Sequence, residues 1–414
     1  MSRALLFLVT ALALFVMVAP ARAKDLEQER VDRLEALGYV EAVPDDPDPS
    51  RRGVVARDDR AWDGVNYYCG AASVRFLDMD GRLLHEIPLS IPPAANSGCL
   101  ADPYRDGLVA VVRRPILSVE EMGGKTVWAR RGPFHHDVGV DAEGRLYALT
   151  VLPGKVRRNG KILEILGQAI TVLSADGRIA RSIDLMPLFG DRIPEARYDS
   201  IERLSADRGK GKLERKKYTR ATDVFHPNSI EVVRWPHAES AGTQVLLSFR
   251  DLDLLAVVDL DEPKVLWAWG AADLVGPHDP WLLPNGHVVV FDNGARQHDA
   301  GKGRSYSRIV EIDPATNRIV WQYTSEPRTD FFSSSRGGAQ PLPNGNVLVT
   351  ESTKGRVFEV TRGGEIVWDY WNTDFRESDG QRRTIYRMYR MSHERFAELR
   401  AGKMPLPSIA APDR

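Results

Sequence analysis

The sequence predicts an all-β protein, a six-bladed β-propeller with a short N-terminal extension and a helical insertion. Two observations carry this prediction. Strand-and-turn units recur along the chain with a period of about 50 residues, and the strands keep the same order within each unit. One four-stranded sheet cannot bury both of its faces, whereas six sheets packed radially can. The 34 glycines and 26 prolines also supply more turn formers than a helical bundle needs.

The clearest repeat starts at residues 283–290 (LPNGHVVV) and returns at residues 342–349 (LPNGNVLV). Each copy is followed by a second strand pattern and then by an Ile-Val-Trp strand, which ends at Trp321 in one unit and at Trp368 in the next. Weaker copies surround Gly144 and Ser73. Short β-branched strands joined by Asn-Gly or Asp-Gly turns are typical of antiparallel hairpins, so each unit is expected to form one blade.

The chain begins with a pattern typical of exported proteins. Arg3 precedes an apolar run over residues 4–19, and a small-x-small motif predicts cleavage after Ala23. An uncleaved anchor is the competing interpretation, but the run is short for a membrane span. We therefore expect a signal peptide (1–23), a lead-in (24–60), a propeller (61–390) with an insertion (187–220), and a C-terminal tail (391–414). The mature protein is expected to be periplasmic or secreted, without stable membrane insertion.

Charge and cysteine content narrow the functional classes. The net charge of −1 gives no indication of a nucleic-acid partner. The two cysteines, Cys69 and Cys99, either pair in an oxidising compartment or stay as two buried thiols, and they are too few for a thiolate zinc cage. Within the insertion, residues 203–220 hold eight basic and two acidic residues. This segment is either a helical lid over the channel that attracts anions or a solvated excursion.

Three histidines occur at related places in successive units. His136 and His278 each precede the turn glycine of their unit by eight residues, and His226 lies at the corresponding place in the unit between them. The first strand of each propeller blade lines the central channel. The three imidazoles are therefore expected to converge on one channel mouth, with Arg250 at the end of a neighbouring strand pointing to the same space.

Such a cluster suits two kinds of chemistry. Three histidines could hold zinc. Alternatively, a neutral imidazole is a nucleophile, a second one serves as general acid or base, and Arg250 with Asn228 orients a transferred oxyanion. The residues next to His136 and His278 are aspartates, which in an extended strand point the opposite way and are expected to support either the fold or the groups that surround the site.

The motifs around these residues resemble the bacterial arylsulfotransferase family, the PAPS-independent aryl sulfate sulfotransferases. The matching stretches are 134–138 (FHHDV), 224–231 (VFHPNSIE), 247–251 (LSFRD), 276–279 (GPHD), 290–294 (VFDNG) and 385–390 (IYRMYR). The resemblance implies ping-pong sulfuryl transfer from an aryl sulfate to a phenol, with His278 as the sulfated nucleophile and no cofactor or metal.

By the same resemblance, His136 and His226 are acid–base or oxyanion-stabilising groups, and Asn228 and Arg250 hold sulfuryl oxygens. His135 is an alternative to His136, and Arg336 is expected to replace a family lysine. The partners implied are small molecules, and the sequence leaves homo-oligomerisation open. Two further functions compete: a quinoprotein-like oxidoreductase, indicated by a tryptophan-docking pattern at residues 313–321 (DPATNRIVW), and a non-catalytic envelope-binding propeller.

Overall fold

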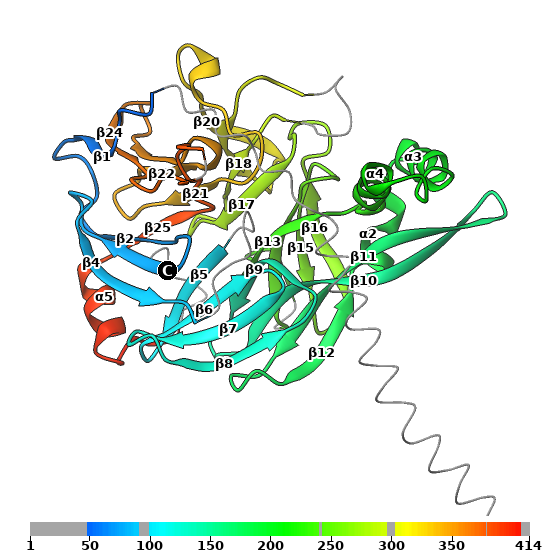
Figure 1. The fold of residues 1–414 in the computed structure, drawn as a ribbon, viewed down its shortest axis with the longest axis horizontal. Helices are drawn as coiled ribbons and strands as arrows, with labels where there is room; N and C mark the ends of the chain where they lie inside the picture. The colour runs from blue at the N-terminus through cyan, green and yellow to red at the C-terminus, as the bar shows by residue number, and fades with distance from the viewer. Residues whose placement is uncertain (1–47, 91–98, 240–241, 296–302, 378, 407–414) are drawn as a thin grey trace, which may run out of the picture.

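The computed structural model describes residues 48–90, 99–239, 242–295, 303–377 and 379–406. Six antiparallel sheets stand in a ring, which confirms the six-bladed propeller (Figure 1). The predicted signal peptide and the first part of the lead-in lie outside the described residues. Every helix among the described residues is too short or too polar to cross a bilayer.

The blades are numbered along the chain, and the innermost strand of each is given first. Blade 1 contains β25 (Met388–Met391), β2 (Val65–Cys69), β3 (Ser73–Leu77) and β4 (Leu83–Pro88). Blade 2 contains β5 (Cys99–Arg105), β6 (Leu108–Arg113), β7 (Ile116–Glu121) and β8 (Thr126–Arg131). Blade 3 contains β9 (Phe134–Val140), β10 (Leu146–Arg158), β11 (Lys161–Leu173) and β12 (Ile179–Asp184).

The second half of the ring has the same plan. Blade 4 contains β13 (Pro227–Val233), β14 (Gln244–Phe249), β15 (Leu254–Asp259) and β16 (Lys264–Trp269). Blade 5 contains β17 (Pro277–Leu282), β18 (Val288–Asp292), β19 (Arg308–Asp313) and β20 (Arg318–Tyr323). Blade 6 contains β21 (Gly338–Pro341), β22 (Val347–Glu351), β23 (Arg356–Val360) and β24 (Ile366–Trp371), and β1 (Gly53–Arg57) pairs with β24 as a fifth strand.

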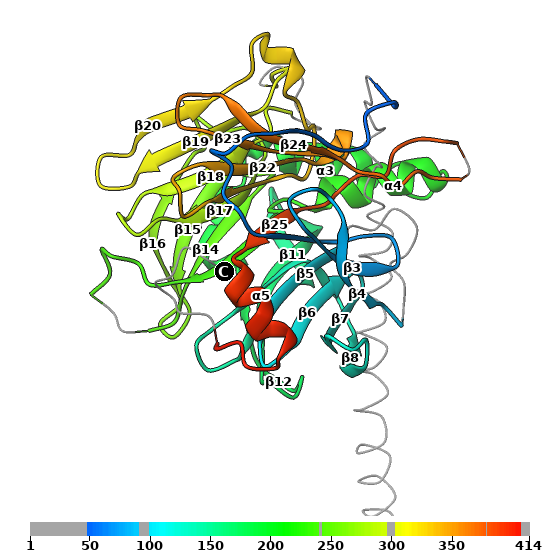
Figure 2. The same ribbon diagram turned by 90° about the vertical axis from the view of Figure 1, so that its left-hand side faces the viewer.

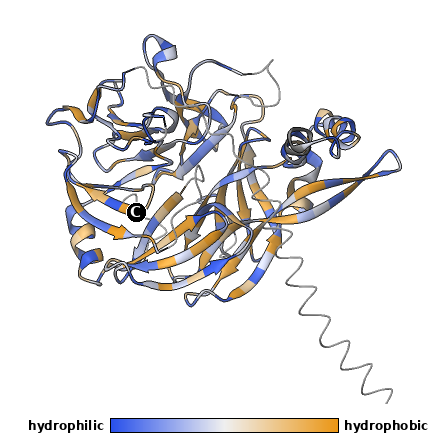
Figure 3. Cartoon of the chain, in the orientation of Figure 1, coloured by the Kyte–Doolittle hydropathy of each residue, from blue (hydrophilic) through white to orange (hydrophobic). Residues whose placement is uncertain are grey.

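The amino-acid pattern of a strand matches its place in the blade. The middle strands β14 and β15 are buried along their whole length, because neighbouring blades cover both faces of the sheet. The outermost strand β20 alternates between exposed and more covered residues, as expected for a sheet edge with one wet face. Apolar residues accordingly run along the strands of the blades (Figure 3).

Both chain ends fasten the ring. The C-terminal strand β25 completes blade 1 by pairing with β2, where Tyr67 lies opposite Tyr389. The lead-in contributes β1 to blade 6, where Val54 lies opposite Tyr370. After β25, helix α5 (His393–Arg400) packs Phe396 against the core of blades 1 and 2 (Figure 2). The first and last blades are thus each joined by a segment from the other end of the chain.

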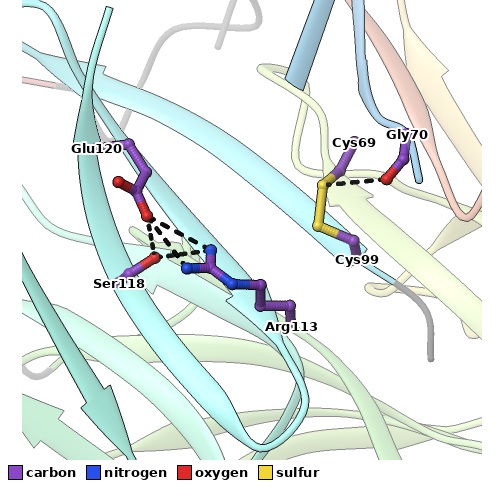
Figure 4. Close-up of a disulfide and its surroundings, with 6 residues drawn as sticks. All are labelled: Cys69, Gly70, Cys99, Arg113, Ser118 and Glu120. Carbon is purple, nitrogen blue, oxygen red and sulfur yellow. Dashed lines mark hydrogen bonds and ion pairs between the residues drawn. A yellow bond between two sulfur atoms is a disulfide. The ribbon is translucent and has the colours of Figure 1, made fainter. Parts of the chain in front are cut away.

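A disulfide between Cys69 and Cys99 joins blade 1 to blade 2, which settles the choice between paired and free cysteines (Figure 4). The two sulfur atoms link β2 to β5 across 30 residues of sequence. Beside it in blade 2, the guanidinium of Arg113 is fully buried and donates to the Ser118 hydroxyl, with the Glu120 carboxylate as its counter-ion.

Replacing both cysteines with serine is expected to lower the free energy of unfolding by about 3–4 kcal/mol, because the unfolded chain regains the entropy of an open 30-residue loop. Urea titration of the oxidised protein and of the double variant measures this difference. The reduced wild-type protein should match the variant, and an unchanged midpoint in both would contradict the expectation.

The predicted helical insertion follows blade 3. It consists of α2 (Met186–Phe189), α3 (Glu195–Ser205) and α4 (Lys212–Thr222), together with the 3-10 turn η1 (Gly190–Arg192). Two further 3-10 turns, η2 (Arg328–Asp330) and η3 (Ser352–Lys354), lie in blades 5 and 6. The insertion is not a solvated excursion, because Tyr198, Ile201 and Tyr218 pack into the core shared by blades 3 and 4.

A long hairpin supports the insertion. Strands β10 and β11 have 13 residues each and extend out of the ring beside α3 and α4 (Figure 1). Ion pairs join this hairpin to the insertion: Lys161 contacts Glu202, and Arg208 lies 3.3 Å from Glu164. The hairpin and the helices thus form one connected projection beside blades 3 and 4.

Candidate active site

The three predicted histidines lie at or near the starts of the inner strands of blades 3, 4 and 5, and Arg250 follows the end of β14. His136 and His278 hold equivalent places in blades 3 and 5. The last residue of each inner strand, Val140 or Leu282, pairs with the first residue of the next strand, and the histidine lies four residues before it. His226 does not share this position: it precedes β13 and lies seven residues before the corresponding residue. Its ring nevertheless contacts that of His136, with the ring centres 4.7 Å apart and the planes at 75°.

A hydrogen-bonded chain runs through the histidines of blades 3 and 4. Nδ1 of His136 lies 2.6 Å from Nδ1 of His135, whose Nε2 lies 2.9 Å from Oε1 of Gln168. The amide nitrogen of Gln168 donates to one carboxylate oxygen of Asp223 over 3.1 Å. The other carboxylate oxygen of Asp223 contacts Nδ1 of His226. The buried carboxylate of Asp223 therefore holds both His226, directly, and the pair of His135 and His136, through Gln168.

These contacts fix the tautomers. Because Gln168 presents an oxygen, Nε2 of His135 must donate, and Nδ1 of neutral His135 then accepts a proton from Nδ1 of His136. This leaves the lone pair of His136 on Nε2. A hydrogen bond from an imidazole Nδ1 to a carboxylate is the arrangement that orients a general base and stabilises its protonated form, and His226 with Asp223 has it.

His278 is held in the same tautomer by different partners. Its Nδ1 lies 2.7 Å from Oδ1 of Asn293 and 3.0 Å from the carbonyl oxygen of Gly276. The amide nitrogen of Asn293 donates to the carbonyls of Ser333 and Arg336, so its oxygen must face the histidine. Both contacts of Nδ1 are acceptors, so this nitrogen carries the proton and Nε2 carries the lone pair.

Burial keeps three of these imidazoles neutral. It lowers the pKa of His135 to about 3, with a further contribution from the charge of His226. Burial and the charge of His226 hold the pKa of His136 well below its usual value. Burial and the charge of Arg387 do the same for the pKa of His278, and Arg250 adds to the effect at both His136 and His278. The charge of Arg250 thus acts on histidines of blades 3 and 5.

At Asp223, the neighbouring charge outweighs burial and favours the ionised form of the side chain. Burial alone would raise the pKa of its carboxyl group, but the charge of His226 and the hydrogen bond between them outweigh burial and hold that pKa below its ordinary value. The carboxylate is therefore available as a permanent partner for the imidazolium that His226 becomes when it takes a proton.

Arg250 is positioned by backbone and side-chain contacts. Its backbone N–H donates to the carbonyl of His226 over 3.1 Å, and its Nε donates to Asp251 over 2.8 Å. Arg197 of helix α3 donates to the same Asp251 carboxylate and to the carbonyl of Asp223, each over 2.8 Å. The insertion is thus tied directly to the carboxylates that hold His226 and Arg250.

A cavity of about 670 Å³ lies between the insertion and the propeller. Arg250, Asp251 and Gly276 line its propeller side, and residues of α3 and α4 line the other. Its size is in the range of roughly 300–1,000 Å³ that pockets for whole small molecules occupy. The predicted lid therefore encloses space next to Arg250 and next to the loop that holds His278.

Asn228 and Arg336 make contacts that support His278. The amide nitrogen of Asn228 donates to the carbonyl of Pro277 over 2.9 Å, and its oxygen accepts from Ser248. The carbonyl of Arg336 holds Asn293, while its guanidinium donates to the Thr384 hydroxyl over 3.2 Å.

Arg387, directly before β25, ties the inner strands together at the centre of the ring. Its fully buried guanidinium donates to Asp137 over 2.9 Å and to the carbonyl of Asn228 over 2.9 Å, and it lies 3.4 Å from Asp279. The two aspartates in turn accept from the backbone of the next blade, at Ile230 and Ala339. They therefore support the fold, which is one of the two roles that the sequence predicted.

Sequence reasoning missed four residues of this cluster: Gln168, Asp223, Asp251 and Asn293. Asp223 lies three residues before His226, a spacing that could have indicated a carboxylate–imidazole pair. Asn293 and Asp251 stand inside the family-like motifs that surround His278 and Arg250. For Gln168, in the middle of β11, the sequence contains no such signal. Within the described residues, no group of three or more His, Cys, Asp or Glu residues is arranged to hold a metal ion.

Comparisons with solved structures concern the fold. A protein of unknown function from Bacteroides caccae has a TM-score of 0.50 and 11% identity, over 79% of this chain and 98% of that one. Virginiamycin B lyase from Staphylococcus aureus has a TM-score of 0.42 and 11% identity, over 79% and 86% of the two chains. No curated protein matches the chain.

The family comparison is more specific. The family model described as arylsulfotransferase (ASST) matches residues 193–373. The match spans the site residues His226, Asn228, Arg250, His278 and Arg336, and it ends short of His135 and His136 on the N-terminal side. It confirms the resemblance seen in the motifs of blades 4 and 5. Residues 193–373, a little under half of the chain, are thus similar to the arylsulfotransferase family.

Proposed function

We propose that the protein transfers a sulfuryl group from an aryl sulfate to a phenol through a sulfohistidine at His278. The family match supports arylsulfotransferase activity in general. The sulfohistidine at His278 is supported by the state of that ring. Two oxygen acceptors hold its Nδ1–H, and burial keeps the ring neutral, so Nε2 carries a lone pair that can attack sulfur.

In the first half-reaction, the lone pair on Nε2 of His278 forms a bond to sulfur while the bond between sulfur and the aryl oxygen breaks. The electron pair of that bond leaves with the aryl oxygen as a phenolate, which takes a proton from the imidazolium of His226 and departs as a phenol. Positive charge from Arg250 stabilises the sulfuryl oxygens as negative charge spreads over them.

In the second half-reaction, the acceptor phenol gives its proton to the now neutral imidazole. Its oxygen then bonds to sulfur as the N–S bond breaks and the electron pair returns to Nε2 of His278. Asp223 makes His226 the better of the two candidate bases, because the carboxylate stabilises the imidazolium. His135 holds the tautomer of His136, and Asn228 and Arg336 position His278.

We also propose the setting of this activity. The mature chain would start after residue 23 and work in the periplasm or outside the cell, with the propeller domain at 61–390 as the catalytic unit. The disulfide between Cys69 and Cys99 supports an oxidising compartment. The substrates are small aromatic molecules, as the family implies.

Trapping the intermediate tests this proposal. The protein is mixed with 4-nitrophenyl sulfate without an acceptor, the release of nitrophenolate is followed, and the digested protein is measured by mass spectrometry under neutral conditions. A burst of about one equivalent and a sulfuryl adduct on the peptide that contains His278 are expected. Turnover without an adduct, or an adduct on another residue, would refute the sulfohistidine, and an absence of turnover would refute the transferase.

Replacing Asp223 with asparagine is expected to lower kcat by about 100-fold with little change in KM, because His226 loses the charge that stabilises its protonated form. Steady-state kinetics with 4-nitrophenyl sulfate and phenol measure the effect. Asp191→Asn, an exposed position in the same insertion, is the control and should behave like the wild type. Equal kcat values for Asp223→Asn and the wild type would remove His226 from acid–base catalysis.

A further inference from the structure

The cavity between the insertion and the propeller is lined by more positive charge than a single sulfuryl group requires. Its walls contain five basic residues and two acidic ones, the basic ones being Arg197, Arg203, Lys217, Arg220 and Arg250. Two of this set, Arg197 at the start of α3 and Arg250 on the propeller side, share the carboxylate of Asp251. Their charge is therefore partly neutralised before any ligand binds.

The other three basic residues, which lie farther along α3 and on α4, form the helical wall of the cavity. Arg203 and Lys217 are exposed, and within the described part of the chain neither has a carboxylate at ion-pair distance; Arg203 donates only to the Ser200 hydroxyl. Arg220 lies close enough to Arg250 for the two guanidinium charges to repel, and burial together with this repulsion lowers the pKa of Arg220. Like charges gathered around one cavity are stabilised when an anion enters it.

The helices that hold these cations are fixed in place. Arg197 ties α3 to Asp223 and Asp251, and Tyr198 and Ile201 bury the same helix in the core of blades 3 and 4. The β10–β11 hairpin braces α3 through the ion pair of Lys161 and Glu202. The cations of the helical wall thus face the cavity from a rigid support, which is what selective binding requires.

We propose that this cavity binds a second anionic group, separate from the sulfuryl group, on the aromatic donor or acceptor, and that Arg203, Lys217 and Arg220 recognise it. The inference rests on the proposed transferase function and names its substrate class: aromatic sulfates or phenols that carry a carboxylate, sulfonate or second sulfate. The transferred group engages the propeller side at Arg250 and His278, while the second anion engages the helical side.

Binding tests the inference without turnover. Isothermal titration calorimetry compares benzene-1,3-disulfonate with benzenesulfonate, whose C–S bonds are inert to transfer. The wild type is expected to bind the disulfonate about tenfold more tightly at low salt and less selectively at high salt. Arg203→Gln combined with Lys217→Gln should abolish the difference. Arg178→Gln, a solvent-exposed control at the outer edge of blade 3, should preserve it.

Steady-state kinetics then show whether the second anionic group belongs to the donor or to the acceptor. The donor arm compares 2-carboxy-4-nitrophenyl sulfate with 4-nitrophenyl sulfate, and the acceptor arm compares 4-hydroxybenzoate with phenol. About a tenfold preference in kcat/KM for the carboxylated member is expected in one arm, and the double variant should lose it while retaining its rate with the uncharged pair.

The outcomes distinguish the two proposals. Equal affinities for the two sulfonates in the wild type, or a preference that survives in the double variant, would overturn the inference even if the enzyme is active. An inactive protein that still prefers the disulfonate, and loses this preference in the double variant, would overturn the transferase but uphold the anion site. Matching melting temperatures of the variants confirm that the fold is intact.

Discussion

Replacing His278 with alanine is expected to lower kcat/KM for sulfuryl transfer by roughly 10⁴-fold, the largest effect of any single substitution in the site. The variant retains Arg250, His226 and the cavity, so it should still bind the aryl sulfate. It lacks Nε2 of His278, the nitrogen whose lone pair is set by the oxygens that hold Nδ1–H. Stopped-flow measurement of nitrophenolate release should therefore show no burst.

The control for this variant is His393→Ala. His393 is exposed at the start of α5, pairs with Asp63 on the surface, and should leave the rate unchanged when removed. If H278A releases nitrophenolate with an undiminished burst, another residue carries the sulfuryl group, and the tautomer argument fails with it.

The same environment predicts the pH dependence. Because burial and the charges of Arg387 and Arg250 hold the pKa of His278 well below its usual value, protonation of this ring should not limit the rate near pH 6. A free histidine nucleophile would already be half protonated at about pH 6.5. The measurement is kcat/KM against pH for the wild type and for variants of the other site histidines. A fall in kcat/KM at about pH 6.5 that persists in all of those variants would contradict a buried, neutral His278.

Much of this architecture was predictable because the repeat is local. Turn residues such as Asn285 and Asn344 hydrogen-bond to the backbone two residues on, so the hairpins are encoded by short motifs. Once the blades are aligned, the equivalence of His136 and His278 follows from counting residues. The same counting misplaced His226, because the connection between β13 and β14, residues 234–243, is longer than the connections 141–145 and 283–287 that follow β9 and β17.

The orienting residues were harder to predict because they act across blades. Gln168 of β11 reaches Asp223 through contacts that exist only when blades 3 and 4 are packed together. The long β10–β11 hairpin is a second example. Its sequence has the pattern of an ordinary strand pair, whereas its contact with α3 depends on an ion pair with a segment about 40 residues away. Sequence patterns identify the reactive groups better than the groups that orient them.

Arg387→Met is expected to lower the free energy of unfolding by about 3–5 kcal/mol, because it leaves buried carboxylates without their counter-ion. The guanidinium of Arg387 joins Asp137 of blade 3 to Asp279 of blade 5 and also holds the carbonyls of Asn228 and Gly337. Methionine fills a similar volume but supplies none of these donors. Urea titration of the wild type and the variant measures the difference.

The loss should depend on pH in a defined direction. Burial already raises the pKa of Asp279 in the wild type, against the opposing charge of Arg387. Without that charge, the pKa of this carboxyl group in the folded variant rises further above its unfolded value. A raised pKa means that the folded state binds the proton more tightly than the unfolded state, so the variant gains stability as the pH falls. The deficit relative to the wild type should therefore shrink as the pH falls from neutral toward the ordinary aspartate pKa of about 3.9.

A compensating variant separates charge from packing. Arg387→Met combined with Asp137→Asn and Asp279→Asn removes the cation and both carboxylates, and it should recover part of the lost stability and lose the pH dependence. A deficit that stays the same at every pH, or one that the two asparagines do not reduce, would show that Arg387 acts by packing alone. In that case the inner strands of blades 3 and 5 would be aligned by their backbone contacts rather than by the ion-pair network at the centre of the ring.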